Sequence, residues 1–176
     1  IQFLTISIGI GLAIAATSLV SPALGAGFRI RARRLSTSAH VLTAAVAALL
    51  AVAVFVAIGP LLTLFGATGR THALASTYLQ IVVPTLPLLA TGMTSSAVLR
   101  SVGDARRAMY VTLAGAVVNT LLDPLLIFWA GLGLEGAAIA SAVSRLAILA
   151  IGLHGVGRVH ALLARPSVAQ ALADAR

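Results

Sequence analysis

The sequence predicts an all-α integral membrane protein with five transmembrane helices, and three observations support this fold class. Hydrophobic residues make up 60% of the 176 residues, whereas charged residues make up only 9%. Soluble domains contain about 25% charged residues, so a soluble fold of this length could not cover so much apolar surface. Five apolar segments reach the roughly 20 residues that a helix needs to cross a bilayer. The third observation is that arginines gather between these segments.

The five predicted spans cover residues 1–26, 39–65, 75–99, 108–129 and 136–156, within a bundle over residues 1–160. The first span is rich in glycine and alanine, which let helices approach closely within lipid. The second span is the most uniformly apolar, so we expect it to face lipid. Pro84 and Pro87 lie in the third span and Pro124 lies in the fourth. Each proline removes a backbone hydrogen bond, so we expect the helix to kink there.

The loops between the spans predict the orientation in the membrane. Four arginines follow the first span, one the second, three the third, none the fourth and three the fifth. The positive-inside rule places the arginine-rich side in the cytoplasm. We therefore expect the loops 29–36 and 100–107 and the tail 161–176 to be cytoplasmic in a multi-pass protein of the inner membrane. The chain then starts outside, which implies a missing first helix.

Composition also excludes several classes of function. The net charge of +8 comes from the inter-span arginines, so membrane orientation explains it better than nucleic-acid binding. Cysteine is absent, which excludes disulfides and thiolate metal sites. We interpret the first residues as a truncated start and not as a signal peptide. Residues 25–27 lack the spacing of a phosphate-binding loop, and no nucleophile and base are paired, so we do not expect an enzyme. No metal site is predicted among the scattered histidines, which are His40, His72, His154 and His160.

Asn119 and Asp123, within the fourth span, are the leading candidates for function. Their spacing of four places both on one face of a helix, about 6 Å apart along its axis. A carboxyl group in a membrane segment is costly, so it usually faces a cavity or a partner and has a function. Pro124 follows directly and frees a carbonyl near residue 120, which can accept a cation or water.

Ser141 and Arg145 on the fifth span extend this site. Counted from the turn between the two spans, Asp123 and Ser141 lie at matching depths of about 9 Å, and Asn119 and Arg145 at about 15 Å. Matching depths on adjacent helices predict one site. A structural interpretation stays open, in which Asn119 and Asp123 bond only to each other and Arg145 holds the hairpin together as the ion partner of Asp123.

Three motifs lie in this part of the chain: R-x-x-G-D at 100–104, V-V-N-x-x-x-D-P-L-L-I-F at 117–128 and G-x-x-G-A-A-I-A-S at 133–141. Together they resemble the multidrug and toxic compound extrusion (MATE) family, in particular its bacterial DNA-damage-inducible branch. By this resemblance, the chain corresponds to helices two to six of the amino-terminal lobe of a twelve-helix transporter built of two six-helix lobes. The first helix and the carboxy-terminal lobe are then missing partners, and we expect a partial lobe that is inactive alone.

The resemblance implies a secondary active antiporter that exports drugs or other xenobiotics in exchange for protons or sodium ions, with no other cofactor. Asn119 and Asp123 match an asparagine and an aspartate of the family's fifth helix, and Ser141 matches a threonine of the sixth. Together with an aspartate of the first helix, these residues bind the coupling proton or sodium ion. Beyond a sodium ion at Asp123 and Asn119, no metal is implied. Arg145 is expected to modulate the site, since a guanidinium that reaches Asp123 would compete with the ion.

The expected partners are the lipid bilayer and a cationic or apolar small-molecule substrate, with no nucleic acid. Two alternatives stay open. The first is a flippase of the same fold that moves a lipid-linked, phosphorylated substrate, which a cationic groove would favour. The second is a membrane bundle that only scaffolds a partner, which predicts that Asp123 is buried, paired and closed to water.

Overall fold

The computed structural model describes the backbone of residues 2–163 and the side chains of residue 7 and residues 9–163, and this part of the chain contains helices and no strand. The predicted all-α fold is therefore confirmed. The α-helices are α1 (Gln2–Gly25), α2 (Arg29–Val56), α3 (Ile58–Leu64), α4 (Gly69–Val82), α5 (Leu86–Ser101), α6 (Ala105–Pro124) and α7 (Gly133–His154). A 3₁₀ turn, η1 (Val83–Thr85), separates α4 from α5, and π-helical turns follow α6 as η2 (Leu125–Trp129) and α7 as η3 (Gly155–Val159).

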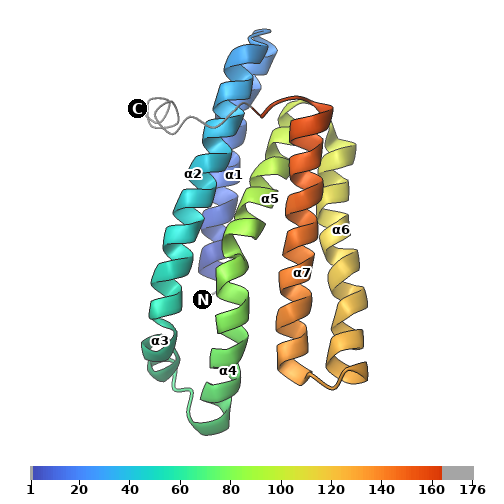
Figure 1. Ribbon diagram of the computed structural model, residues 1–176. Helices are drawn as coiled ribbons and strands as arrows, with labels where there is room; N and C mark the ends of the chain where they lie inside the picture. Colours follow the sequence, from blue (N-terminus) through green and yellow to red (C-terminus); the bar gives the residue numbers. More distant parts are fainter. Residues whose placement is uncertain (1, 164–176) are drawn as a thin grey trace.

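The helices form an elongated bundle in which α5 is central (Figure 1). It packs against α1 and α2 on one side and against α6 and α7 on the other. The α6–α7 hairpin therefore lies across α5 from α1 and α2, and α4 also contacts α7. The arrangement packs α6 against α7 and brings α7 alongside α4, near the break between α4 and α5.

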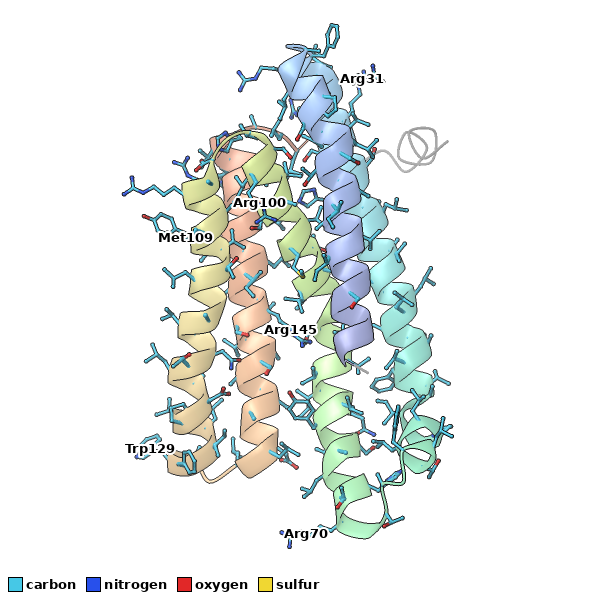
Figure 2. All side chains as sticks on the ribbon, turned by 180° about the vertical axis from the view of Figure 1, so that it is seen from behind. Arg31, Arg70, Arg100, Met109, Trp129 and Arg145 are labelled. Atoms are coloured by element: carbon cyan, nitrogen blue, oxygen red, sulfur yellow. The ribbon has the colours of Figure 1, made fainter. Side chains whose placement is uncertain are left out.

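Four helical segments are long and apolar enough to cross a membrane: Arg29–Val56, Gly69–Ser101, Ala105–Trp129 and Gly133–Val159. Helix α1 is 24 residues long, and its apolar part with described side chains is Gly9–Gly25. Figure 2 places Trp129 and Arg70 at one end of the bundle and Arg31 at the other. The alternation of loops that the sequence predicts therefore matches the up-and-down path of the chain.

Some predicted boundaries are wrong. Residues 29–36, expected as a loop, form the first two turns of α2, because arginine is a good helix former and nothing interrupts the helix. With 28 residues, α2 is about 42 Å long and exceeds the ~30 Å hydrocarbon core, so its basic turns extend past the apolar layer. The second predicted span, 39–65, is divided between α2 and α3. In the predicted loop 100–107, only residues 102–104 are not helical. Most of the predicted tail 161–176 is not among the residues that the structure describes.

The prolines act differently from one another. Pro84 lies in η1, where the α-helix is interrupted, and α5 leans toward α7 beyond this point (Figure 1). Pro87 lies in the first turn of α5, where a missing N–H leaves no acceptor unsatisfied. The two residues therefore mark one break and not two kinks. Pro124 is the last residue of α6, at the change from α-helix to the π-helical turn η2.

Glycines bring the backbones of α5, α6 and α7 close together. Ile148 of α7 lies against both Gly92 of α5 and Gly115 of α6, where an added Cβ would come within 2.4 Å of its side chain. A Cβ at Gly136 would lie 2.7 Å from the backbone carbonyl of Leu126 in η2. Small residues thus let helices approach within lipid, as the sequence predicts for the first span, but the tightest contacts are those of α7 with α5 and α6.

Candidate functional site

Asn119 and Asp123 lie together on α6, as their spacing predicts. The Asn119 amide nitrogen donates a hydrogen bond of 2.6 Å to Asp123 Oδ2. The second carboxyl oxygen, Asp123 Oδ1, is buried and has no hydrogen-bond partner among the described residues. An oxygen of this kind is costly when it carries charge, and a proton or a cation would remove that cost.

The backbone around this pair also departs from regular α-helix hydrogen bonding. Because Pro124 has no N–H, the carbonyl of Thr120 receives no hydrogen bond from four residues further along. The π-helical turn Leu125–Trp129 follows at once, and such turns are frequent at functional sites. The end of α6 therefore offers one carboxyl oxygen and one carbonyl oxygen that regular helix geometry does not satisfy.

Ser141 and Arg145 do not bond to the Asn119–Asp123 pair. The Ser141 backbone carbonyl accepts a bond of 2.8 Å from the Ser144 hydroxyl, and within residues 9–163 no hydrogen bond joins the Ser141 side chain to Asp123. Arg145 points instead to the break between α4 and α5. Its Nη1 donates to the Val82 carbonyl and to Thr85 Oγ1, each at 2.8 Å. The ion pair between Arg145 and Asp123 is absent from the described part of the chain.

A buried polar network joins α2 to α5, and the sequence analysis did not identify it. The Ser36 carbonyl can only accept, so His40 Nδ1 donates to it at 2.7 Å, while His40 Nε2 lies 2.9 Å from the Ser95 hydroxyl. Thr94 donates to Thr43 at 3.2 Å. The feature of the sequence that could have indicated this network is the run of three consecutive hydroxyl residues, 94–96, within an apolar span. This network holds α2 against α5.

A cavity of about 620 Å³ opens between α1, α5 and α6, with Ile148 of α7 at its base. Its walls are mainly apolar, and Arg100 is the one charged residue among the described residues that line it. Arg100 Nη1 donates to Ser96 Oγ at 2.9 Å. Small-molecule sites have volumes of about 300–1,000 Å³, so the cavity has the size of a ligand site.

At the Arg100 end of the bundle, Asp104 caps α6 and ties it to the segment after α7. Asp104 Oδ1 accepts from the Arg107 backbone N–H at 3.0 Å, and Oδ2 contacts the Arg107 guanidinium and His160 Nε2. The bond from the Arg107 backbone, followed by those from the His160 and Arg107 side chains, holds the pKa of the Asp104 carboxyl below its usual range. The end of α7 is thereby fixed against the start of α6.

The family is decided by comparison with known proteins. The model of the MatE family matches residues 1–125, which is more than half of the chain. The chain belongs to the MatE family. The predicted resemblance to MATE transporters is thus confirmed, while the DNA-damage-inducible branch stays a prediction.

Individual members show how much of a MATE protein this chain represents. It is 35% identical over 164 residues to a FAD transporter of Shewanella oneidensis, which covers 90% of this chain and 36% of that protein. It is 34% identical over 84 residues to the multidrug export protein MepA of Staphylococcus aureus, covering 48% of this chain and 19% of that protein. A multidrug resistance MATE family transporter solved in an inward-facing conformation matches its fold with a TM-score of 0.83, at 22% identity over 96% of this chain and 41% of that one. The chain therefore spans about a third of the length of the FAD transporter and about two fifths of the length of the solved transporter.

Proposed function

We propose that this MATE chain contributes the ion-coupling part of a secondary active antiporter that exports drugs or other xenobiotics across the cytoplasmic membrane. The observation that carries the proposal is the buried, unpartnered Oδ1 of Asp123 beside an Asn119 amide that binds Oδ2. A proton or a sodium ion taken up at Oδ1 neutralises the carboxylate, and Asn119 keeps its bond to the other oxygen. Ser141 would join the site when the ion is bound.

The coupling follows from the position of Asp123 next to the π-helical turn. Neutralising a charge at the end of α6 changes which packing of the hairpin is more stable, and a ligand shifts such an equilibrium by its differential affinity for the two states. The cavity between α1, α5 and α6 lies on the same bundle and has room for a small molecule. A first helix and a carboxy-terminal lobe, as in longer relatives, would complete the cleft.

Replacing Asp123 with asparagine in the complete transporter tests this function. We expect D123N to abolish ethidium efflux driven by a proton or sodium gradient in proteoliposomes. The amide carries no negative charge that a proton or a sodium ion could neutralise. Glu135→Gln is the matched control, since Glu135 is an exposed acid in the first turn of α7 and should not take part in coupling. Efflux by D123N at the wild-type rate would disprove the coupling role.

A phosphorylated substrate is the second candidate, and one observation favours it. The flippase alternative predicts a cationic groove, and the charged residue that lines the cavity is Arg100. The FAD transporter relative, which matches 90% of this chain, carries a name that also points to a phosphorylated molecule. Competition of ethidium efflux by excess FAD would support this candidate, and a lack of competition would favour cationic drugs.

A further inference from the structure

His40 is a buried titratable side chain within the membrane-spanning helix α2. It lies about 16 Å along the helix from Arg29, the first residue of α2, and is 6% exposed. Helices α2 and α5 pack side by side (Figure 1), and His40 faces α5. An ionisable group inside a membrane bundle is costly, so it usually has a function. For a histidine, the function to consider is the uptake and release of a proton.

Both ring nitrogens of His40 lie against polar groups. Nδ1 is 2.7 Å from the Ser36 carbonyl, which can only accept, so Nδ1 carries a hydrogen. Nε2 is 2.9 Å from Ser95 Oγ. The Ser95 hydroxyl is also 3.0 Å from the carbonyl of Thr91, one turn earlier on α5. This hydroxyl therefore has one hydrogen and two acceptors within reach, which are the Nε2 lone pair and the Thr91 carbonyl.

The same arrangement fits a neutral and a protonated ring. With a neutral ring, the Ser95 hydroxyl donates to Nε2. With a protonated ring, the N–H at Nε2 donates to Ser95 Oγ, and the hydroxyl donates to the Thr91 carbonyl. Each N–H and O–H group has an acceptor in both forms, so uptake of a proton leaves no donor unsatisfied. Rotation of one hydroxyl thus accommodates the proton.

The groups on either side of this pair extend it into a polar line across three helices. Ser36 Oγ, one turn before His40, is buried and has no hydrogen-bond partner among the described residues. A hydroxyl both donates and accepts, so Ser36 can pass a proton along α2 from its arginine-rich end. On the far side, a Cβ at Gly152 of α7 would lie 3.2 Å from Ser95 Oγ. A charge on His40 therefore arises close to the contact of α5 with α7.

The charged groups on the helices around His40 bond to other partners. Arg33 of α2, Arg100 of α5 and Arg145 of α7 each donate to an acceptor other than His40. Helices α1 and α3 and the turn η1 contain no ionisable side chain. No carboxylate of the described part of the chain pairs with His40, so hydrogen bonds and not a counter-charge would hold its proton. The remaining charged or titratable residues of α2 and α7 are exposed: Arg29, Arg31, Arg34, Glu135 and His154.

We propose that His40 is a second proton-binding site of this bundle, separate from Asp123, and that the Ser95 hydroxyl holds its proton at Nε2. Hard cations take oxygen ligands, so this imidazole site binds protons and not sodium ions. Protonation adds a positive charge beside the contact of α5 with α7, and it thereby shifts the balance between packings of these helices. The inference does not depend on ion coupling at Asp123, because no hydrogen bond joins the two residues in the described part of the chain.

Nuclear magnetic resonance of ¹⁵N-labelled histidine rings tests this site in the complete transporter in lipid nanodiscs. The signals that disappear in His40→Gln belong to His40. At about pH 8 we expect a hydrogen on Nδ1 and none on Nε2, and at about pH 4.5 a hydrogen on both, reversibly and with unchanged helix content. Ser95→Ala should lower the midpoint of this titration by about one pH unit, because a hydrogen bond to the charged ring is stronger than one to the neutral ring.

Thr94→Val is the matched control for Ser95→Ala. It removes the neighbouring hydroxyl, which bonds to Thr43 and not to His40, and it should leave the midpoint unchanged. Should His40→Gln fail to fold, the histidine signals that move in Ser95→Ala and stay in Thr94→Val identify His40.

Three results would each overturn the inference. They are an Nδ1 without hydrogen at about pH 8, a His40 ring that stays neutral down to about pH 4.5 in the folded protein, and an unchanged midpoint in Ser95→Ala. The proposed coupling at Asp123 is judged separately. If D123N loses ion-driven efflux while His40 never takes up a proton, the transport function stands and only this second site falls.

Discussion

At the scale of single residues, Asp123 and Arg145 are opposite charges in adjacent helices that take different partners. Asp123 bonds to Asn119 on its own helix and keeps one oxygen free, whereas Arg145 reaches across to α4 and η1. An ion pair between them would have cancelled both charges and left no group to bind an ion. Their separation leaves Asp123 Oδ1 without a partner among the described residues, and the proposed ion coupling rests on this oxygen.

The carboxylate of Asp104 gives a testable pH dependence outside the membrane. Its pKa is below the ordinary value of 3.8 in the folded protein, so the ionised form stabilises the fold at higher pH and this contribution is lost as the pH falls below about 3.8. We expect the wild type to unfold at a higher temperature than Asp104→Asn at pH 7. The difference should shrink as the pH falls from about 4 to 2.

Thermal unfolding in detergent at each pH measures this difference. Glu135→Gln is the control, because Glu135 is exposed and forms no ion pair in the described part of the chain. A difference between wild type and Asp104→Asn that stays constant down to pH 2 would contradict the assigned cap and its bonds to Arg107 and His160.

At the scale of helices, glycine contacts decide how the hairpin closes. Gly136 in the first turns of α7 lies against the backbone of Leu126, directly after the π-helical turn begins. Backbone cannot move aside as a flexible side chain can, so this contact fixes the end of α6 against the start of α7. The geometry of the Asn119–Asp123 pair depends on this closure because the pair lies just before the same turn.

Gly136→Ala should therefore destabilise the protein. The new Cβ would lie 2.7 Å from the Leu126 carbonyl carbon and oxygen, and such overpacking costs about 1–3 kcal/mol. Gly11→Ala on α1 is the matched control, because no atom lies within 4 Å of its Cβ position. Alanine there should be neutral or stabilise by up to about 1 kcal/mol. Thermal unfolding of both variants in detergent measures these effects. Equal stability of Gly136→Ala and Gly11→Ala would show that the hairpin can relax around the added methyl group.

At the scale of the whole molecule, the arrangement of charged ends predicts orientation. Arg31 lies at one end of the bundle and Arg70 and Trp129 at the other (Figure 2), and the arginine-rich end carries the loop between α5 and α6. The positive-inside rule places this end in the cytoplasm. The α6–α7 turn, and with it the end of α6 that carries Asp123, would then lie on the outer side.

Cysteine labelling tests this orientation, since the chain has no cysteine of its own. In a cysteine-free background, a membrane-impermeant maleimide should label Thr68→Cys in intact cells. It should label Ala105→Cys only after the membrane is permeabilised, because that residue starts α6 beside the basic loop. Labelling of Ala105→Cys but not of Thr68→Cys in intact cells would show that the orientation is opposite to the predicted one.

The sequence by itself determined the class of the protein, its helices and the Asn119–Asp123 pair. Hydropathy over twenty residues and a spacing of four on one helix are local properties, so they can be read from the sequence without knowledge of the fold. Matched depth in the hairpin also predicted that Ser141 and Arg145 would join this pair, but only the tertiary structure decided their partners. Counting residues from the turn gives the height of a residue along the helix but not the direction in which its side chain points. For Arg145, the break at η1 supplied acceptors on another helix. The network of His40 and Ser95 and the cavity beside Arg100 likewise depend on residues distant in sequence, which only packing brings together.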